Sequence, residues 1–411
     1  MTSIRIGICV LAAFAVLAFG TVEIWSESIL EAGAATLFLW WSILMFRNRK
    51  IEIHWNAIFW PLLAFLGVAG GQLLFGGSIY PFLTRVAFLK LVACVLLFFL
   101  AVQSFRTRDD LRFVAWFLLG FGFAIAVVGI AQNYTSHDVI YWSRPLTEGG
   151  SPFGPYVDRD HFAGLMELIV PVGMSLIALG GVRREQMAFT GILTLVPVVA
   201  LVLTASRGGI VSFLFEVGLL AALMKARRAR FQTAAVAAIS LSVLAVLGWL
   251  GAGTVLERVK SSSVRELSAD RRVSMLRGAW HIFLHHPLAG TGLGTLVTAY
   301  PRYETLYDGR IVDHVHDDYA EMLAEMGIAG GLCGLAFLVM LFRESRRRLA
   351  QEQSAFSQAI HTSGIVACAG LLVHGLVDFN FHIPANGLLF LLQAAVVVSP
   401  VIHRRQRVLI T

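Results

Sequence analysis

Charged residues are scarce in this chain, and their scarcity excludes a soluble globular protein. Asp, Glu, Lys and Arg make up 14% of its 411 residues, whereas soluble domains contain roughly a quarter. Cysteine is rare as well: the four cysteines lie within or beside apolar runs and show no CxxC spacing, which argues against a disulfide framework or a zinc-binding cysteine set. Hydrophobic residues instead make up 57% of the chain. We therefore expect a polytopic membrane protein built as a single domain over residues 1–411.

The net charge of +7 does not indicate a nucleic-acid partner. Arg and Lys occur in short clusters between apolar runs rather than along one polar face, so they report membrane topology. The first apolar run has the length of a signal peptide, but the sequence from Thr21 to Trp25 offers no small-residue cleavage site. We expect that run to remain as the first membrane span.

Apolar runs long enough to cross a bilayer recur along the whole chain, since a hydrocarbon core roughly 30 Å thick needs about 20 helical residues. The sequence therefore predicts an all-α integral membrane protein with about twelve transmembrane helices. The runs are centred on residues 4–20, 29–46, 57–75, 86–105, 111–133, 162–180, 187–205, 209–224, 231–252, 319–342, 360–376 and 384–402.

Every second connection between these runs is basic, and basic connections stay on the cytoplasmic side of a membrane. Both termini are then expected in the cytoplasm. The basic connections are residues 47–50, 106–108, 183–184, 225–230, 343–348 and the tail 403–407. The remaining connections face outward, and the longest of them, residues 253–318, separates the ninth and tenth runs and is expected to carry the chemistry.

An amphipathic helix is expected inside this long outer loop, over residues 274–284. Its apolar residues share one side, its basic residues supply polar character, and the spacing suits a helix that lies on the membrane surface. Pro287 ends the helix. The glycines of residues 290–294 predict a tight turn rather than a phosphate-binding loop, because no strand precedes them and no Lys follows.

His316 is the first candidate for chemistry, because it places a titratable imidazole at the outer end of the tenth run. A neutral imidazole is a suitable general base, worth roughly 10²- to 10⁴-fold in rate, and Asp317 is its expected charge partner. Two other interpretations remain open: a solvated loop histidine, and a metal site. The metal site would be formed by His314, His316, Asp317 and Asp318.

Basic residues near the outer ends of the runs are the second set of candidates. Arg207 lies between two apolar runs beside Gly208 and Gly209; it is either a snorkelling anchor or a bidentate phosphate ligand. Arg85 and Lys90 lie at the outer end of the fourth run, where a Lys inside an apolar segment is a functional candidate or a snorkelling side chain. Two acidic residues of other runs, Glu167 and Glu216, are candidate counterions of Lys90.

These residues resemble the O-antigen ligase family and the related O-antigen and exopolysaccharide polymerases. His316-Asp317-x9-Gly327-x2-Gly330 is similar to the His-Asn-x9-Gly-x2-Gly signature of those proteins, and the resemblance extends from about residue 80 to the end of the chain. Departures include Asp317 in place of the usual Asn and Asp160 where Asn is common. Supporting stretches are residues 154–164, 206–209, Arg272 ahead of 286–292, and 377–386.

The resemblance implies a metal-independent glycosyltransferase of the bacterial inner membrane that uses no cofactor and whose site faces the periplasm. The donor would be a glycan on undecaprenyl diphosphate and the acceptor a saccharide hydroxyl, with membrane lipid as the surrounding partner. By similarity, His316 would deprotonate the acceptor. Arg207 and Arg272 would bind the diphosphate, with Arg277, Arg85 and Lys90 as further candidates and His314, Asp317, Asp160 and His161 in supporting positions.

Three alternatives follow from the same residues. The enzyme is either a polymerase that extends a repeat-unit polysaccharide or a ligase that transfers the glycan to a lipid A core; residues 378–386 favour the polymerase. A transporter or flippase for a lipid-linked oligosaccharide would instead use Lys90, Glu167 and Glu216 as a polar pathway. A membrane scaffold without activity would leave His316, Arg207 and Arg272 unexplained as a set.

Overall fold

The computed structural model describes residues 1–49, 52–136, 139–146, 150–226, 262–307, 309 and 311–400. The described chain is helical apart from one short antiparallel ribbon. The elements are α1 (Thr2–Leu17), η1 (Phe19–Thr21), α2 (Ile24–Arg47), α3 (Phe59–Leu74), α4 (Pro81–Ser104), α5 (Arg108–Thr135), β1 (Val139–Ile140), β2 (Arg144–Pro145), α6 (Arg159–Ala178), α7 (Arg184–Leu203), α8 (Arg207–Ala226), α10 (Ser262–His285), α11 (Leu296–Ala299), η2 (Tyr300–Arg302), α12 (Asp318–Gln351), α13 (Ala355–His374), η3 (Asn380–His382) and α14 (Pro384–Val398).

The all-helical membrane architecture is confirmed. Eleven of the twelve expected runs coincide with a helix, and the remaining one, residues 231–252, lies outside the described residues. Eight described helices are long and apolar enough to cross a bilayer: α2, α4, α5, α6, α7, α8, α12 and α13. α1, α3 and α14 are apolar but shorter. The chain is therefore a multi-pass membrane protein, while the count of twelve spans stays a prediction.

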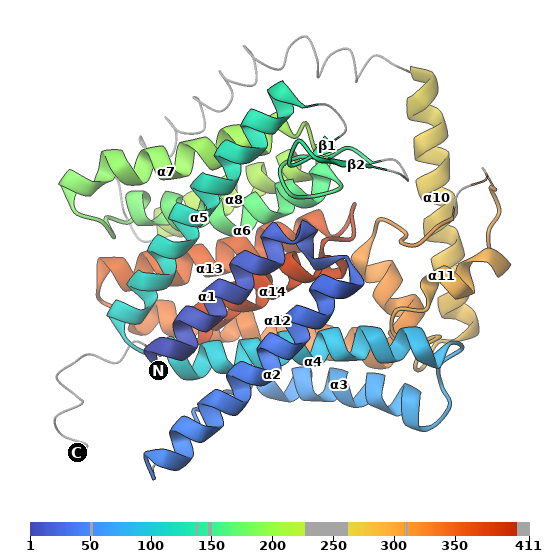
Figure 1. Ribbon diagram of the computed structural model, residues 1–411, viewed down its shortest axis with the longest axis horizontal. Helices are drawn as coiled ribbons and strands as arrows, with labels where there is room; N and C mark the ends of the chain where they lie inside the picture. Colours follow the sequence, from blue (N-terminus) through green and yellow to red (C-terminus); the bar gives the residue numbers. More distant parts are fainter. Residues whose placement is uncertain are drawn as a thin grey trace.

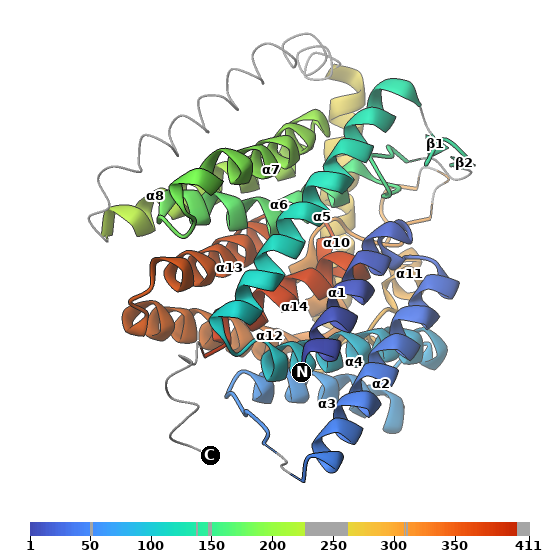
Figure 2. The same ribbon diagram turned by 60° about the vertical axis from the view of Figure 1, so that its left-hand side comes forward.

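The long helices form a layered bundle (Figure 1). α7 and α8 lie on one side, followed by α6, α13, α14 with α12, and finally α4 with α3; the turned view keeps this order (Figure 2). Every residue of α6 from His161 to Ala178 is buried, so α6 forms the centre of the core together with α13, its most extensive neighbour. Polar groups on these two helices are consequently surrounded by protein rather than by lipid.

α10 lies across one end of this bundle and runs in a different direction from α4 and α12 (Figure 1). The predicted helix at residues 274–284 is confirmed as part of α10, but its apolar residues do not form one face. Met275, Ala279 and Ile282 are buried against a small separate core, while Leu276 and Trp280 are 43% and 51% exposed. The helical advance of about 100° per residue separates the two sets, and the exposed set suits the membrane interface.

α12 changes direction at Gly327, whose φ of +60° and ψ of −163° interrupt the helix. The backbone groups released there pair with the segment that follows Pro287: Ile328 N–H donates to Pro287 O at 2.8 Å, and Gly292 N–H donates to Glu325 O at 3.0 Å. Gly290 packs its backbone against Glu325 so closely that a Cβ would collide with the Glu325 carbonyl carbon. The glycine turn at 290–294 is thus a close-packing segment, in agreement with the sequence analysis.

Candidate active site

A group of five histidines and five acidic or aromatic partners occupies the end of the bundle at which α12 begins and α13 ends. Asp318 N–H donates to Gly375 O at 2.9 Å, and Tyr319 Oη donates to Leu372 O at 2.6 Å, so the two helix ends are joined directly. The members are His161, His314, His316, His374 and His382, with Glu167, Asp318, Glu321, Asp378 and Phe379.

His316 contacts Asp378, which lies 62 residues further along the chain. The His316 Nδ1 and Asp378 Oδ1 atoms are 3.4 Å apart, and the imidazole stands edge-on to Phe379 with 4.9 Å between ring centres. The His316 side chain remains 31% exposed. Because Nδ1 faces the carboxylate, Nε2 is the ring nitrogen left to exchange a proton with a substrate.

The backbone at His316 is held in the left-handed region, with φ of +54°. Residues with a side chain visit this region rarely, and they remain there where the surrounding structure fixes them, often at functional sites. Val315 on one side is buried in the small core beneath α10, and Asp317 on the other caps α12. The imidazole therefore projects from an anchored turn.

Asp378 is the centre of the group. It is 3% exposed, and its second oxygen lies 3.7 Å from His161 Nε2 and 3.7 Å from His374 Nε2. Burial alone would raise the pKa of Asp378, but the hydrogen bond from His316 and the imidazoles of His161 and His374 lower it well below its usual range. Asp378 therefore stays a carboxylate beside His316.

A buried ion pair continues from Asp378 into the bundle. His374 Nδ1 lies 2.8 Å from Glu167 Oε1, with both side chains almost fully buried. The sequence suggests Glu167 and Glu216 as counterions of Lys90, and this prediction is wrong. Lys90 Nζ instead pairs with Glu27 Oε1 of α2 at 2.9 Å, a partner that lies 63 residues away in sequence.

Asp317 does not act as the charge partner of His316, which corrects the expectation from sequence. Its carboxylate accepts hydrogen bonds from the N–H groups of Tyr319 and Ala320 at 3.0 and 2.9 Å. An acidic side chain directly before a helix satisfies the unpaired N–H groups of the first turn, and that local demand turns Asp317 toward α12. Burial raises the pKa of Asp317.

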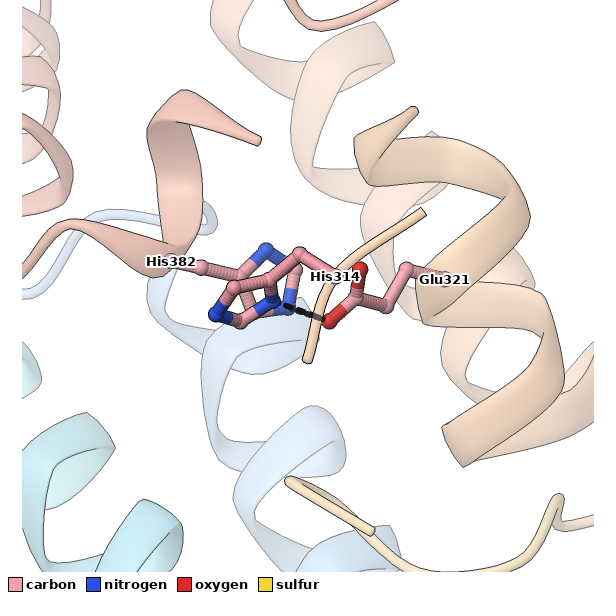
Figure 3. Close-up of side chains that lie close together, drawn as sticks. All are labelled: His314, Glu321 and His382. Carbon is pink, nitrogen blue, oxygen red and sulfur yellow. Dashed lines mark hydrogen bonds and ion pairs between the residues drawn. The ribbon is translucent and has the colours of Figure 1, made fainter. Parts of the chain in front are cut away.

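The metal set considered from sequence, His314 with His316, Asp317 and Asp318, is not brought together. His314 Nδ1 turns to Glu321 Oε1 at 2.7 Å, whereas His316 turns to Asp378. Asp318 is buried and contacts His382 Nδ1 at 2.8 Å. His314 and His382 thus converge on Glu321 (Figure 3).

His161 and Asp160 lie in the first turn of α6, which Asp158 caps by accepting from Asp160 N–H at 2.9 Å. His161 packs edge-on against Phe379 with 4.5 Å between ring centres. Both residues come from the stretch that carries the family resemblance. The structure places His161 inside the group and Asp160 at its edge.

Arg207 opens α8 and is exposed, and the glycine that follows it packs directly on the group. A Cβ at Gly208 would lie 2.7 Å from His374 Nε2. The Arg207 guanidinium has no ion-pair partner within the part of the chain that the structure describes, so it is available to an anion from outside.

The other candidate cations lie around the same end of the bundle. Arg277 lines a pocket of about 340 Å³ with Leu276, Trp280, His281 and Ala320 of α12, and Arg272 is exposed on the same helix. Arg85 is exposed near the start of α4. Among these candidate cations, Lys90 alone pairs with a carboxylate of the described residues, namely Glu27.

Sequence reasoning gave no role to Asp378, Phe379, His374 or His382. Phe379 contacts three of the imidazoles and stacks on His314 at 4.3 Å with 17° between ring planes. Asp378, Phe379 and His382 lie within residues 377–386, one of the stretches that carry the family resemblance, whereas no sequence signal indicated His374.

Residues 192–335 match the family model described as O-antigen ligase. The matched segment contains Arg207, Arg272, His314 and His316 and ends within α12, before Asp378. No curated protein matches the chain. Over residues 192–335, about a third of its length, the chain is therefore similar to the O-antigen ligase family.

Proposed function

We propose that this protein is a glycosyltransferase that moves a glycan from undecaprenyl diphosphate to a saccharide hydroxyl, with His316 as general base and without a catalytic metal ion. The match of residues 192–335 to the O-antigen ligase model supports the reaction class, glycan transfer in O-antigen or related polysaccharide synthesis. The observation that carries the mechanism is the contact between His316 and the buried carboxylate of Asp378.

In the proposed step, the acceptor hydroxyl gives its proton to Nε2 of His316 and its oxygen bonds to the anomeric carbon of the donor. The bond from that carbon to the diphosphate oxygen breaks, and its electron pair leaves with undecaprenyl diphosphate. Asp378 stabilises the imidazolium that forms. A single displacement of this kind inverts the anomeric configuration.

The departing diphosphate needs fixed positive charge on the side opposite the base. Arg207 is the first candidate, because its backbone neighbour Gly208 touches His374 while its guanidinium stays exposed. Arg272 and Arg277 on α10 and Arg85 on α4 are the further candidates. Lys90 is left out of this set because Glu27 holds its ammonium group.

The proposed topology has twelve spans in one domain of the bacterial inner membrane, with both termini in the cytoplasm and residues 253–318 in the periplasm. Its support is the alternation of basic connections and the position of α10 across one end of the bundle (Figure 1), where it packs against α12. Polyprenyl chains would approach from the membrane, and α10 presents Leu276 and Trp280 on its exposed side.

The test uses purified protein in detergent with EDTA and an undecaprenyl-diphosphate oligosaccharide donor. One tube receives a second lipid-linked repeat unit as acceptor and another receives a lipid A core. Elongated glycan in the first tube would make the protein a polymerase, and product only in the second would make it a ligase. His316→Ala and Arg207→Ala should abolish either product.

His54→Ala is the matched control, since His54 contacts Gln103 through its backbone and lies between α2 and α3, outside the histidine group. It should retain the wild-type rate. Full activity in His316→Ala would refute the role of His316 as general base. If neither tube gave product, a liposome flux assay would test the transporter alternative, for which the buried Glu216 is the supporting feature: its oxygens have no hydrogen-bond partner among the described residues.

A further inference from the structure

Three metal-ligating side chains meet beside the proposed site although they come from separate segments (Figure 3). His314 precedes α12, Glu321 lies in its first turn and His382 lies in η3, more than 60 residues later. Glu321 Oε1 is 2.7 Å from His314 Nδ1 and 3.2 Å from His382 Nε2. One donor atom from each residue lies within 4.8 Å of the others.

We propose that His314, Glu321 and His382 bind one divalent transition-metal ion, with Zn²⁺ as the best-fitting ion. Two imidazoles and one carboxylate suit zinc and its neighbours, whereas magnesium and calcium prefer oxygen ligands throughout. Zinc bonds of about 2.0–2.1 Å in tetrahedral geometry require ligand atoms about 3.3 Å apart. The His382 Nε2–Glu321 Oε1 separation of 3.2 Å matches that value, and the His314 ring would move outward from its 2.7 Å contact with Glu321 to admit the ion.

His382 and Glu321 have outer partners of the kind found at metal sites. Histidine ligands commonly donate their second ring N–H to a carboxylate, which fixes the ring and the tautomer. His382 Nδ1 contacts Asp318 Oδ1 at 2.8 Å, which leaves Nε2 directed at Glu321. The second oxygen of Glu321 accepts from Val315 N–H at 3.1 Å, so the first is turned to the centre.

The exposure of the two histidines and the restricted ring of His314 are also compatible with a bound ion. The His314 and His382 side chains are 26% and 23% exposed, whereas Glu321 is 1% exposed. An ion therefore enters from the histidine side, where a fourth position stays open to water. Phe379 stacks on His314 and restricts its ring, which lowers the entropy lost on binding.

The ion would link three segments: the turn that contains His316, the start of α12, and η3. It would lie two residues from the proposed base and outside the transfer step itself, so its role is to position the turn. The site does not depend on the proposed glycan transfer, because its evidence is the donor set and its outer partners alone.

The experiment measures metal content and binding in the purified full-length protein without donor or acceptor. Protein is stripped with a chelator, incubated with excess Zn²⁺, desalted and analysed by mass spectrometry of the metal; affinity follows from competition with a chromophoric chelator. Wild type should retain one Zn²⁺ per chain. Glu321→Gln and His314→Gln should weaken binding by at least a hundredfold, and Asp318→Asn by about 10- to 100-fold.

His281→Gln is the control, because His281 is an exposed histidine on α10 outside the three ligands; it should bind Zn²⁺ as wild type does. Elution volume on size exclusion checks the fold of each variant, and the partly exposed His314 offers the substitution least disruptive to the buried carboxylates. Absence of stoichiometric Zn²⁺ in wild type, or equal affinity in His314→Gln, would overturn the proposal and leave an ordinary hydrogen-bonded histidine–glutamate pair. Neither result decides whether the protein transfers glycan, because metal binding is measured without donor or acceptor.

Discussion

Replacing Gly327 by Ala should destabilise the protein strongly, because the break in α12 requires a residue without a side chain. The φ of +60° and ψ of −163° lie in a region that glycine alone populates readily, and strain of this kind costs about 1–3 kcal/mol. A Cβ on Gly327 would also lie 2.5 Å from the Leu288 carbonyl carbon and 2.6 Å from its oxygen. Those are backbone atoms, so no side-chain rotation relieves the contact.

The added Cβ would push α12 away from the segment at Leu288 and so weaken the backbone hydrogen bonds between these two segments. Ile328 N–H donates to Pro287 O at 2.8 Å and Ala329 N–H donates to Leu288 O at 3.0 Å. Each such bond contributes about 1 kcal/mol. Together with the strain, we expect Gly327→Ala to lower the free energy of unfolding by about 3–5 kcal/mol.

The assay is thermal unfolding in detergent, followed by intrinsic tryptophan fluorescence. Gly67→Ala is the control: Gly67 lies inside α3 and a Cβ there would meet nothing within 4 Å, so the substitution should stabilise the helix by roughly 0.5–1 kcal/mol. The two variants should move the midpoint in opposite directions. A Gly327→Ala midpoint equal to or above that of Gly67→Ala would refute the argument.

Three further predictions concern polar contacts. Asp378→Asn should lower the transfer rate about 10²-fold in initial-rate assays. Because the folded pKa of Asp378 is lowered, its carboxylate contributes stability above the unfolded pKa of about 3.9 and loses that contribution as the pH falls through the folded pKa. The difference in unfolding midpoint between wild type and variant should therefore shrink as the pH is lowered below about 4. Lys90→Met should cost about 1–3 kcal/mol of unfolding free energy without slowing transfer per folded molecule, and Glu27→Gln in the same chain should recover part of the loss. Tyr156→Phe removes the buried 2.8 Å hydrogen bond to Asn386 Oδ1 and should cost about 1–3 kcal/mol by the same thermal assay.

Local patterns were sufficient to predict most of the helices. Apolar runs of about 20 residues have no stable alternative in a membrane, and eleven of the twelve became helices in the described chain. The sequence did not predict that some apolar residues of α10 are buried against the protein while others are exposed, because both sets are equally apolar. Sequence spacing shows the direction of a side chain but not what lies opposite it.

The contacts of the site depend on the tertiary fold, which local patterns do not contain. His316 was recognised from its signature, yet its partner Asp378 arrives from a different helix connection. Asp317 was predicted as the partner of His316 because the two residues are adjacent, but the Asp317 carboxylate instead caps α12 by accepting from Ala320 N–H. Lys90 likewise meets Glu27 only because α2 packs on α4.

The length of α12 has a consequence for the acceptor. Its 34 residues extend about 51 Å, and residues 343–351 at its basic end take about 13 Å of that length. Residues 318–342 extend about 37 Å along the helix path, a little more than a hydrocarbon core of roughly 30 Å, and His316 lies just beyond their outer end. An acceptor anchored in the same bilayer therefore needs no long spacer between its lipid and its reactive hydroxyl, because the base stands close to the headgroups.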